Sequence, residues 1–263
     1  MQPYSRRAPV LFAAETDSTN LALRRLAAEG AVDGTVFWSA RQSAGRGRLG
    51  RSFASPEGGL YYSMLLTASD KPERDLLLTP AAGLAVCRAL ERVCGVRCGL
   101  KWPNDLLLDG KKLCGILTEG FAAGPRRCLA LGIGVNVNTA AFPAELEGIA
   151  VSIRQITGRE TPLDALAAVL TEELDALLPA ARGGDAALTE ELDALLPAAR
   201  ARESALLEAY RARCLTVGRE VLALRNGGSR AALALGVDAD YALRVRWPDG
   251  AEEALRSGEV SIR

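Results

Sequence analysis

The sequence predicts an α+β fold that ends in a small antiparallel β-barrel. Of its 263 residues, 49% are hydrophobic and 24% are charged, which is typical of a globular protein with one or two domains. Strand-like runs alternate with helical patterns over residues 19–137. After residue 214 only short strand-like runs follow, separated by turn residues. We therefore expect two domains, 1–214 and 215–263.

Helices are predicted over residues 19–29 and 76–93. Ser18 or Thr19 can cap the first helix, and their hydroxyls can equally bind a polar ligand. Thr79 followed by Pro80 has the chemistry of a helix start, so the second helix can begin later than its apolar run.

Strands are predicted over residues 35–39, 60–66 and 127–137. Residues 106–108 and 113–117 flank Asp109 and Gly110, and this pair suits the positive φ angles of a type I′ turn. We expect a hairpin there.

Residues 170–182 recur without change at 188–200, which indicates a tandem duplication. The leucines of each copy have helical spacing, but Pro179 and the glycines after residue 182 argue against one continuous rod. We expect one copy to cover the core and the other to form a surface excursion. The acidic character of the repeat fits a solvated helix pair and leaves a docking role open.

The barrel is predicted from four apolar runs after residue 214. They cover residues 221–224, 231–235, 241–247 and 259–262, with turn residues at 226–228, 238–240 and 248–250.

Composition excludes several classes of protein. There is no histidine, so Ser-His-Asp and Cys-His catalysis and His-ligated zinc are excluded, and catalysis must use Lys, Arg, Asp, Glu or the backbone. The six cysteines form no CxxC pair and fit buried thiols. Thirty-two basic side chains balance 32 acidic ones, so any anion site is local. The apolar run at 10–14 is too short for a signal peptide, and we expect a cytoplasmic protein.

Residues 41–51 form a local cationic segment with three glycines and four arginines, and residues 35–55 contain no carboxylate. Glycines let successive N–H groups face one anion, and guanidinium groups bind carboxylate or phosphate in a bidentate manner. A nucleic-acid contact or a solvated loop would fit the same residues. The segment is not a P-loop, because GxxxxGK[ST] does not occur.

Lys101 is one of only four lysines, against 28 arginines. It precedes Trp102 and Pro103 at the end of an apolar run, where an ammonium group can clamp a phosphate as a point charge. An ordinary strand-end lysine is the alternative. Asn104 and Asp105 can orient it or cap a turn.

Four segments in this order resemble the biotin protein ligases. They are ETDSTN at 15, RQSAGRGRLGR at 41, KWPNDLLLDGKKLCGIL at 101 and GIGVNVN at 132, and the resemblance extends to GEVSIR at the C-terminus. It implies a catalytic domain related to class II synthetases, with a mixed sheet and helices, and a C-terminal SH3-like barrel. It also implies biotin and MgATP as substrates, biotinyl-5′-AMP as intermediate, and a lysine of a biotin carboxyl carrier protein as acceptor.

The resemblance also implies roles for individual residues. Lys101 and Arg48 would be catalytic. The biotin-binding residues would be Ser18, Thr19, Asn20, Gln42, Gly45, Arg46, Gly47, Arg48, Lys101 and Gly115. The ATP and adenylate residues would be Arg46, Arg48, Lys101, Lys112, Asn136 and Arg263. Glu259 lies where the family's barrel helps ATP and acceptor binding, and the magnesium ligands stay unassigned.

Two residues depart from the family pattern. Leu49 stands where many relatives have arginine, and Phe53 where many have tryptophan, which would affect closure of the loop rather than the type of reaction.

About fourteen residues precede ETDSTN, too few for a winged-helix domain, so we expect no DNA binding. No membrane contact is expected, and the protein is expected to be a monomer or homodimer.

Two other functions stay open at this point. A lipoate or octanoyl ligase would have a related fold with a different pocket. A nucleic-acid-binding module without enzymatic activity would explain the arginine loop and would bind RNA in a salt-dependent manner.

Overall fold

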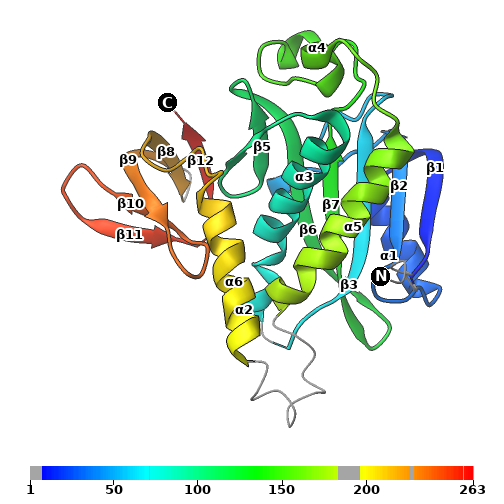
Figure 1. The fold of residues 1–263 in the computed structure, drawn as a ribbon, viewed down its shortest axis with the longest axis horizontal. Coiled ribbons are helices and arrows are strands. Elements are labelled where there is room, and N and C mark those ends of the chain that lie inside the picture. Colours follow the sequence, from blue (N-terminus) through cyan, green and yellow to red (C-terminus); the bar gives the residue numbers. More distant parts are fainter. Residues whose placement is uncertain (1–7, 71, 183–195, 226–227, 257, 263) are drawn as a thin grey trace.

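A seven-stranded mixed sheet forms the larger part of the protein in a computed structural model, which describes residues 8–70, 72–182, 196–225, 228–256 and 258–262. The sheet has the order β1-β2-β3-β7-β6-β5-β4 (Figure 1). Its strands are β1 (Val10–Thr16), β2 (Val36–Gln42), β3 (Leu60–Thr67), β4 (Gly99–Lys101), β5 (Asp105–Leu108), β6 (Lys111–Ala123) and β7 (Arg126–Val135). Only β1 and β2 pair in parallel, and the other neighbours are antiparallel.

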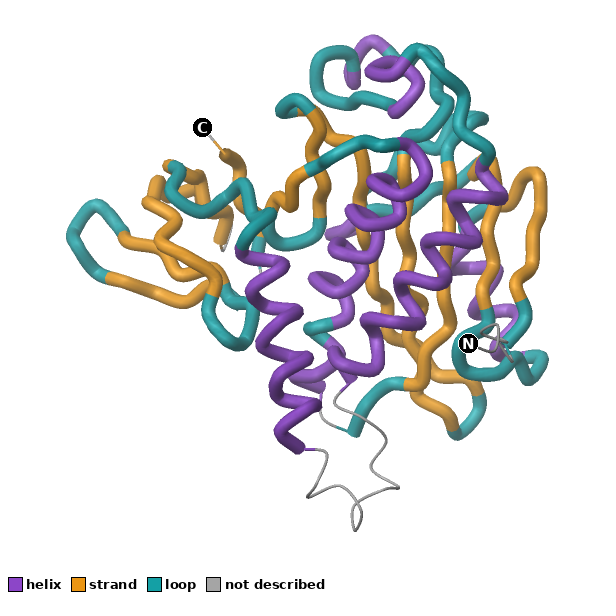
Figure 2. The backbone as a smooth tube through the Cα atoms, in the orientation of Figure 1, coloured by secondary structure: helices purple, strands orange, loops and turns teal. Residues whose placement is uncertain are grey.

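Helices cover both faces of this sheet. The helices are α1 (Thr19–Ala28), α2 (Pro72–Asp75), α3 (Leu78–Cys94), α4 (Ile153–Thr157), α5 (Leu163–Arg182) and α6 (Leu196–Arg211). Because side chains alternate along a strand, β3 turns Leu60, Tyr62 and Met64 toward the core under α3 and α5. The other face of β3 carries Leu65, which packs with Leu23 of α1. Figure 2 shows the large sheet with α3 and α5 in front of it.

The local predictions for the first half are largely confirmed. Helix α3 begins at Leu78, later than its apolar run, and ends on Gly95 in the left-handed conformation. Thr79 does not cap it, because Leu77 is the N-cap residue and the Thr79 hydroxyl lies 3.2 Å from that of Thr118. Asp109 and Gly110 both have positive φ, at 49° and 76°, and join β5 to β6 as the predicted type I′ hairpin. Strands β1 and β4 were not predicted.

The first copy of the repeat covers the core. Leu170, Leu174, Leu177 and Leu178 are buried, and the Tyr62 hydroxyl lies 2.9 Å from that of Thr171. Pro179 does not end the helix, because α5 continues to Arg182. Most of the second copy lies outside the described residues, and its last five residues begin α6.

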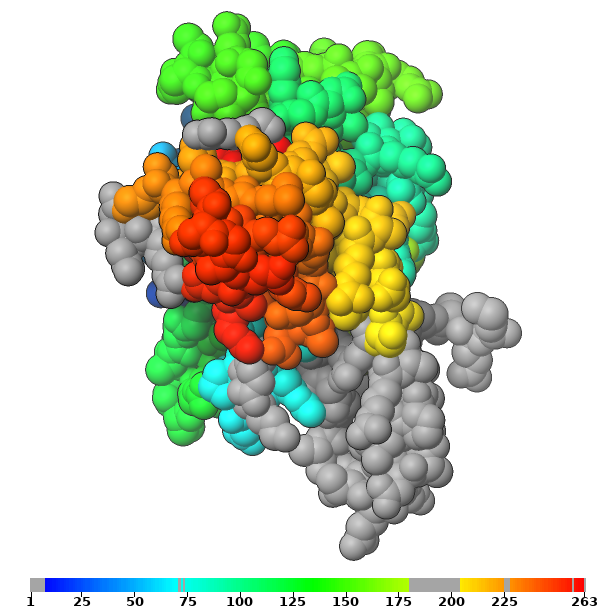
Figure 3. Space-filling view, turned by 90° about the vertical axis from the view of Figure 1, so that its left-hand side faces the viewer, coloured from blue at the N-terminus to red at the C-terminus, as the bar shows by residue number. Residues whose placement is uncertain are grey.

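The C-terminal residues form a second, antiparallel sheet of five strands, in the order β11-β10-β9-β8-β12. These are β8 (Glu220–Arg225), β9 (Gly228–Val237), β10 (Leu243–Arg246), β11 (Glu252–Leu255) and β12 (Glu259–Ile262). This arrangement is consistent with an SH3-like domain, and β11 is the strand that the sequence did not predict. Figure 3 shows these residues in orange and red beside α6 in yellow.

The two sheets meet at β4. The backbone of Leu100 bonds to Arg213 and Leu215, at 2.8 Å each. The Trp102 indole donates to the carbonyl of Tyr241, and the Trp102 backbone N–H donates to the hydroxyl of Thr216. The C-terminal sheet is therefore fixed directly against the segment that contains Lys101.

All six cysteines are free thiols, four of them buried, as predicted. Within the described ranges, no helix combines the length and the apolar character that crossing a bilayer takes.

Candidate active site

A cavity opens on the α1 face of the large sheet and brings the four sequence segments together. Its floor is formed by β6 and β7, and its walls by the start of α1, the arginine loop, the segment after β4 and the start of β12. The predicted residues that line it are Ser18, Thr19, Asn20, Gln42, Arg46, Gly47, Arg48, Lys101, Lys112, Gly115 and Glu259.

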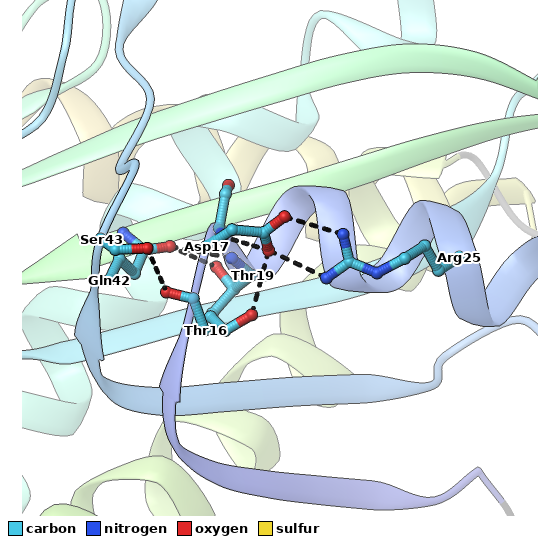
Figure 4. A network of polar contacts seen from close by, with 7 residues as sticks. Thr16, Asp17, Thr19, Arg25, Gln42 and Ser43 are labelled. Atoms are coloured by element: carbon cyan, nitrogen blue, oxygen red, sulfur yellow. Dashed lines mark hydrogen bonds and ion pairs between the residues drawn. The ribbon is translucent and has the colours of Figure 1, made fainter.

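A hydrogen-bonded network fixes the start of α1 beside the arginine loop. Gln42 Oε1 accepts from the backbone N–H of Thr19 at 2.8 Å and lies 3.2 Å from its hydroxyl. Gln42 Nε2 donates to Ser55 at 2.8 Å. Figure 4 shows how Thr19 and Gln42 face one another across the network. Thr19 and Gln42, two of the predicted biotin contacts, are thereby joined directly.

Asp17 supports this network from outside the cavity. Its carboxylate accepts two bonds from Arg25, at 2.8 and 2.9 Å, and one from the backbone N–H of Ser18 at 2.6 Å (Figure 4). The Arg25 guanidinium holds the pKa of the Asp17 carboxyl well below its usual value. The bond to Ser18 also satisfies a backbone donor at the helix start.

Ser18 is the N-cap residue of α1, but its hydroxyl makes no capping bond. The residue is only 2% exposed, yet it lines the cavity. No hydrogen bond of its hydroxyl is found among the described residues. Its hydroxyl is therefore free to bind a ligand, which a capping role would prevent.

Small residues on the floor make room for side chains from other segments. A Cβ on Gly132 would lie 2.5 Å from Asn20 Oδ1, and one on Gly134 would lie 2.6 Å from the Phe53 ring. Gly115 pairs with Gly134 and also lies against Phe53. The glycines on the cavity floor therefore allow Asn20 and Phe53 to pack closely against the sheet.

The arginine loop forms a short hairpin on the cavity. Arg46 and Ser52 form an isolated antiparallel bridge, and Gly47 N–H donates to the carbonyl of Arg51 at 2.7 Å. Arg48 donates to Asn104 Oδ1 at 3.0 Å. Leu49, one of the two departures from the family pattern, is 78% exposed at the tip, where its φ is 57°. Arginine at this position would therefore extend into solvent in the conformation described.

Lys101 lies at the end of β4, and its ammonium forms no hydrogen bond or ion pair within the described ranges. Glu259 of β12 lines the same cavity and accepts from Arg51 at 2.6 Å. Arg51 lowers the pKa of the Glu259 carboxyl, and the charges of Lys101 and Arg48 add to this effect. An unpaired ammonium beside two guanidinium groups makes this end of the cavity suitable for anions.

Lys112 contributes a further cation, which is already paired. Its Nζ lies 2.7 Å from Asp105 and 5.7 Å from the centre of the Phe53 ring. A phosphate bound here would have to share the Lys112 ammonium with the Asp105 carboxylate.

Three predicted site residues are not placed in the cavity wall. Asn136 donates to the backbone carbonyls of Lys112 and Val151, so its amide group joins two segments of the fold. Gly45 directly precedes the hairpin, and a Cβ on it would meet the Phe53 carbonyl. Arg263 lies outside the described residues. The roles of these three residues in ligand binding stay predictions.

Sequence reasoning missed several residues of the site, among them Tyr61 and Glu119. Tyr61 lines the cavity beside Phe53, and Glu119 holds Asn20 and Arg46 from just outside it. Alternation along the predicted strand at 113–117, extended by two residues, would have placed Glu119 on the same face as Gly115.

Comparison with known proteins agrees with this geometry. A family model described as the biotin/lipoate A/B protein ligase family matches residues 12–136. The chain is 34% identical over 255 residues to the biotin–[acetyl-CoA-carboxylase] ligase of Paracoccus denitrificans, covering 94% of this chain and 98% of that protein. The chain belongs to the biotin/lipoate A/B protein ligase family.

Other members of the family match to different extents. A Mycobacterium tuberculosis biotin–[acetyl-CoA-carboxylase] ligase is 35% identical, over 82% of this chain and 74% of that protein. The bifunctional ligase/repressor BirA of Bacillus subtilis is 40% identical over 147 residues, and the chain spans 45% of its length. The structure resembles that of the Aquifex aeolicus biotin protein ligase in complex with biotin and ATP, with a TM-score of 0.76 at 28% identity and coverage of 97% and 98%.

Proposed function

We propose that this protein activates biotin with ATP to biotinyl-5′-AMP and transfers the biotinyl group to a lysine of a biotin carboxyl carrier protein. The observation that carries the proposal is that the Lys101 ammonium, which has no partner within the described ranges, and Arg48 line one cavity in a member of this family. A relative of known structure binds biotin and ATP, and two relatives are named for acetyl-CoA carboxylase.

The chemistry explains why cations gather at this end of the cavity. In the first step the biotin carboxylate attacks the α-phosphate of ATP, and both reactants are negative. Lys101 and Arg48 would reduce their repulsion and stabilise the charge that develops on the phosphate as pyrophosphate leaves. The arginine hairpin would also keep water from the adenylate, which is a reactive mixed anhydride.

In the second step the acceptor amine attacks the biotinyl carbonyl carbon, and AMP leaves with the bonding electrons. We assign no base for this step. A carboxylate is the expected type, because the chain has no histidine.

Magnesium enters the proposal only as the counter-ion of ATP. In the described part of the chain, no three His, Cys, Asp or Glu side chains converge on a metal site. Mg²⁺ commonly keeps several waters and is held by substrate phosphates, so we assign it no ligand and no step.

Several further expectations stay part of the proposal. They are the division into domains 1–214 and 215–263, the individual ligand contacts, a cytoplasmic location, the absence of DNA binding, and a monomeric or homodimeric state.

The test is a transfer assay with labelled biotin, ATP and a purified carrier domain. We expect label on the carrier only when ATP is present, and no label when the acceptor lysine is replaced by arginine. A parallel reaction with labelled lipoate should leave the carrier unlabelled. Transfer of lipoate in place of biotin, or of neither, would refute the proposal.

A further inference from the structure

Glu119 lies on β6, on the same face of the sheet as Gly115 and Leu117 of the cavity floor. Its side chain is only 16% exposed and meets groups from two other segments. Glu119 Oε2 accepts from Asn20 Nδ2 at 2.9 Å, and Oε1 lies 3.1 Å from Arg46 and 3.5 Å from Arg24. One carboxylate thus connects the start of α1 to the arginine hairpin.

The carboxylate determines which way the Asn20 amide points. A carboxylate can only accept hydrogen bonds, so Asn20 must turn its NH₂ group toward Glu119. The carbonyl oxygen then points to the other side, where Ser63 donates to it at 2.6 Å. With Glu119 replaced by a donor, Asn20 Nδ2 would keep only its longer bond to the backbone carbonyl of Leu117, at 3.4 Å.

The packing leaves Asn20 little other room. The residue is 4% exposed, and its amide oxygen occupies the space that a Cβ on Gly132 would need. Ser63 also lies 2.7 Å from the hydroxyl of Thr19, so a turn of the Asn20 amide would disturb the neighbouring hydroxyl of the cavity wall. A substitution of Glu119 would therefore affect two cavity residues, Asn20 and Thr19, although Glu119 itself does not line the cavity.

Glu119 also anchors one of the three arginines of the hairpin. Arg48 is held by Asn104 and Arg51 by Glu259, while Arg46 is held by Glu119. In this conformation the Arg46 guanidinium is committed to a protein carboxylate, which differs from the role of direct ligand contact that the resemblance implied.

We infer that Glu119 is a positioning residue that orients the Asn20 amide in the cavity wall and holds the arginine hairpin over the ligand through Arg46. This inference rests on the proposed function. Glu119 itself does not line the cavity, so it acts through Asn20 and Arg46.

The test is Glu119→Gln, which keeps the size of the side chain. Glutamine offers one acceptor oxygen and one NH₂ group, so either Asn20 or Arg46 must face a donor. We expect the KM for biotin in ATP–pyrophosphate exchange to rise about tenfold while kcat stays within about twofold, the pattern of lost binding rather than lost chemistry. The Kd of biotin measured calorimetrically without ATP should rise in parallel.

Glu173→Gln is the matched control. Glu173 is a carboxylate of similar burial, 12% exposed, that pairs with Arg92 and Arg88 on the opposite face of the sheet. Its loss should leave the KM and Kd for biotin unchanged. An equal rise in both variants would show a general loss of stability and overturn the inference, as would unchanged biotin binding in folded Glu119→Gln.

Glu119→Asp carries the test if the glutamine variant does not fold. Aspartate keeps the charge but is one methylene shorter, so it cannot reach both partners, and the KM for biotin should again rise. An unchanged KM overturns the inference. Failure of the proposed function would be distinguishable, because it would show as absent biotin-dependent exchange in the unaltered protein.

Discussion

At the scale of single residues, we expect replacement of Lys101 to have the largest effect on activity. The Lys101 ammonium has no partner within the described ranges, and Lys101 lines the same cavity as Arg48. Because no carboxylate contacts this charge directly within the described ranges, it can act on a bound anion, and Lys101→Ala should lower biotin-dependent ATP–pyrophosphate exchange by about 100-fold or more. Lys111, an exposed lysine at the β5–β6 turn, is the control, and Lys111→Ala should retain full exchange. Near-normal exchange in Lys101→Ala would disprove the catalytic role.

Tyr61 provides a prediction about pH. The side chain is 1% exposed and donates to the carbonyl of Pro56 at 2.8 Å. Burial raises the pKa of its phenol above the usual value of about 10. Above about pH 10 the unfolded chain loses a proton that the folded protein keeps. The stabilisation by Tyr61 is therefore complete below that pH and is lost as the pH rises.

Tyr61→Phe tests this by comparison with the unaltered protein. At pH 7 the variant should be less stable by about 1 kcal/mol, the typical contribution of one hydrogen bond. The difference should narrow above about pH 10, because phenylalanine does not ionise. Denaturant unfolding at pH 7 and at a pH above about 10 measures this difference in stability. The ionisation of the other tyrosines cancels, because both proteins contain them. A difference that does not depend on pH would contradict the explanation.

At the scale of elements, the arginine hairpin is the part expected to respond to ligands. Arg46 and Arg51 are 46% and 63% exposed, so trypsin can reach them when the hairpin opens locally. A ligand that binds only the closed hairpin lowers the open fraction. Cleavage within residues 43–53 should therefore become at least about fivefold slower with biotin and ATP together.

Arg97 provides the internal control for this experiment. It is 88% exposed and lies between α3 and β4, away from the hairpin. Cleavage at Arg97 should proceed at the same rate with and without ligands. Equal protection at both places, or at neither, would count against closure of the hairpin.

At the scale of the whole molecule, the C-terminal sheet completes the cavity. Glu259 and Val260 of β12 line it, and Arg51 of the hairpin pairs with Glu259. Tyr241 and Thr216 hold Trp102, the residue after Lys101. The second sheet therefore contributes to the site directly, which the sequence indicated only through the resemblance.

The duplication provides a prediction on the same scale. Deleting residues 183–200 gives the same chain as deleting residues 170–187, because the copies are identical. The first copy, which covers the core, stays in the shortened chain, and only the first five residues of α6 are lost from the described helices. The shortened protein should keep biotin transfer and a melting temperature within about 3 °C of the full chain. Loss of either would show that both copies pack.

The sequence by itself determined the elements whose signals are local. The turn at Asp109 and Gly110 depends on φ preference, and the buried leucines of the first repeat copy depend on periodicity, both of which neighbouring residues decide. The motifs also indicated most residues of the cavity wall, because each motif is continuous in the chain.

Only the tertiary structure decided what depends on contacts between distant segments. Strand β1 pairs with β2, which lies 26 residues further along the chain, and β4 has only three residues, which pair with the adjacent β5 and form a bridge to the distant Cys214. Glu119 looks like an ordinary strand carboxylate until Asn20 and Arg46, 99 and 73 residues away, are folded against it. The backbone carbonyls of Lys112 and Val151, which accept from the Asn136 amide, likewise come from other segments of the chain. Local sequence carries no signal for such contacts, since they form only when the chain closes on itself.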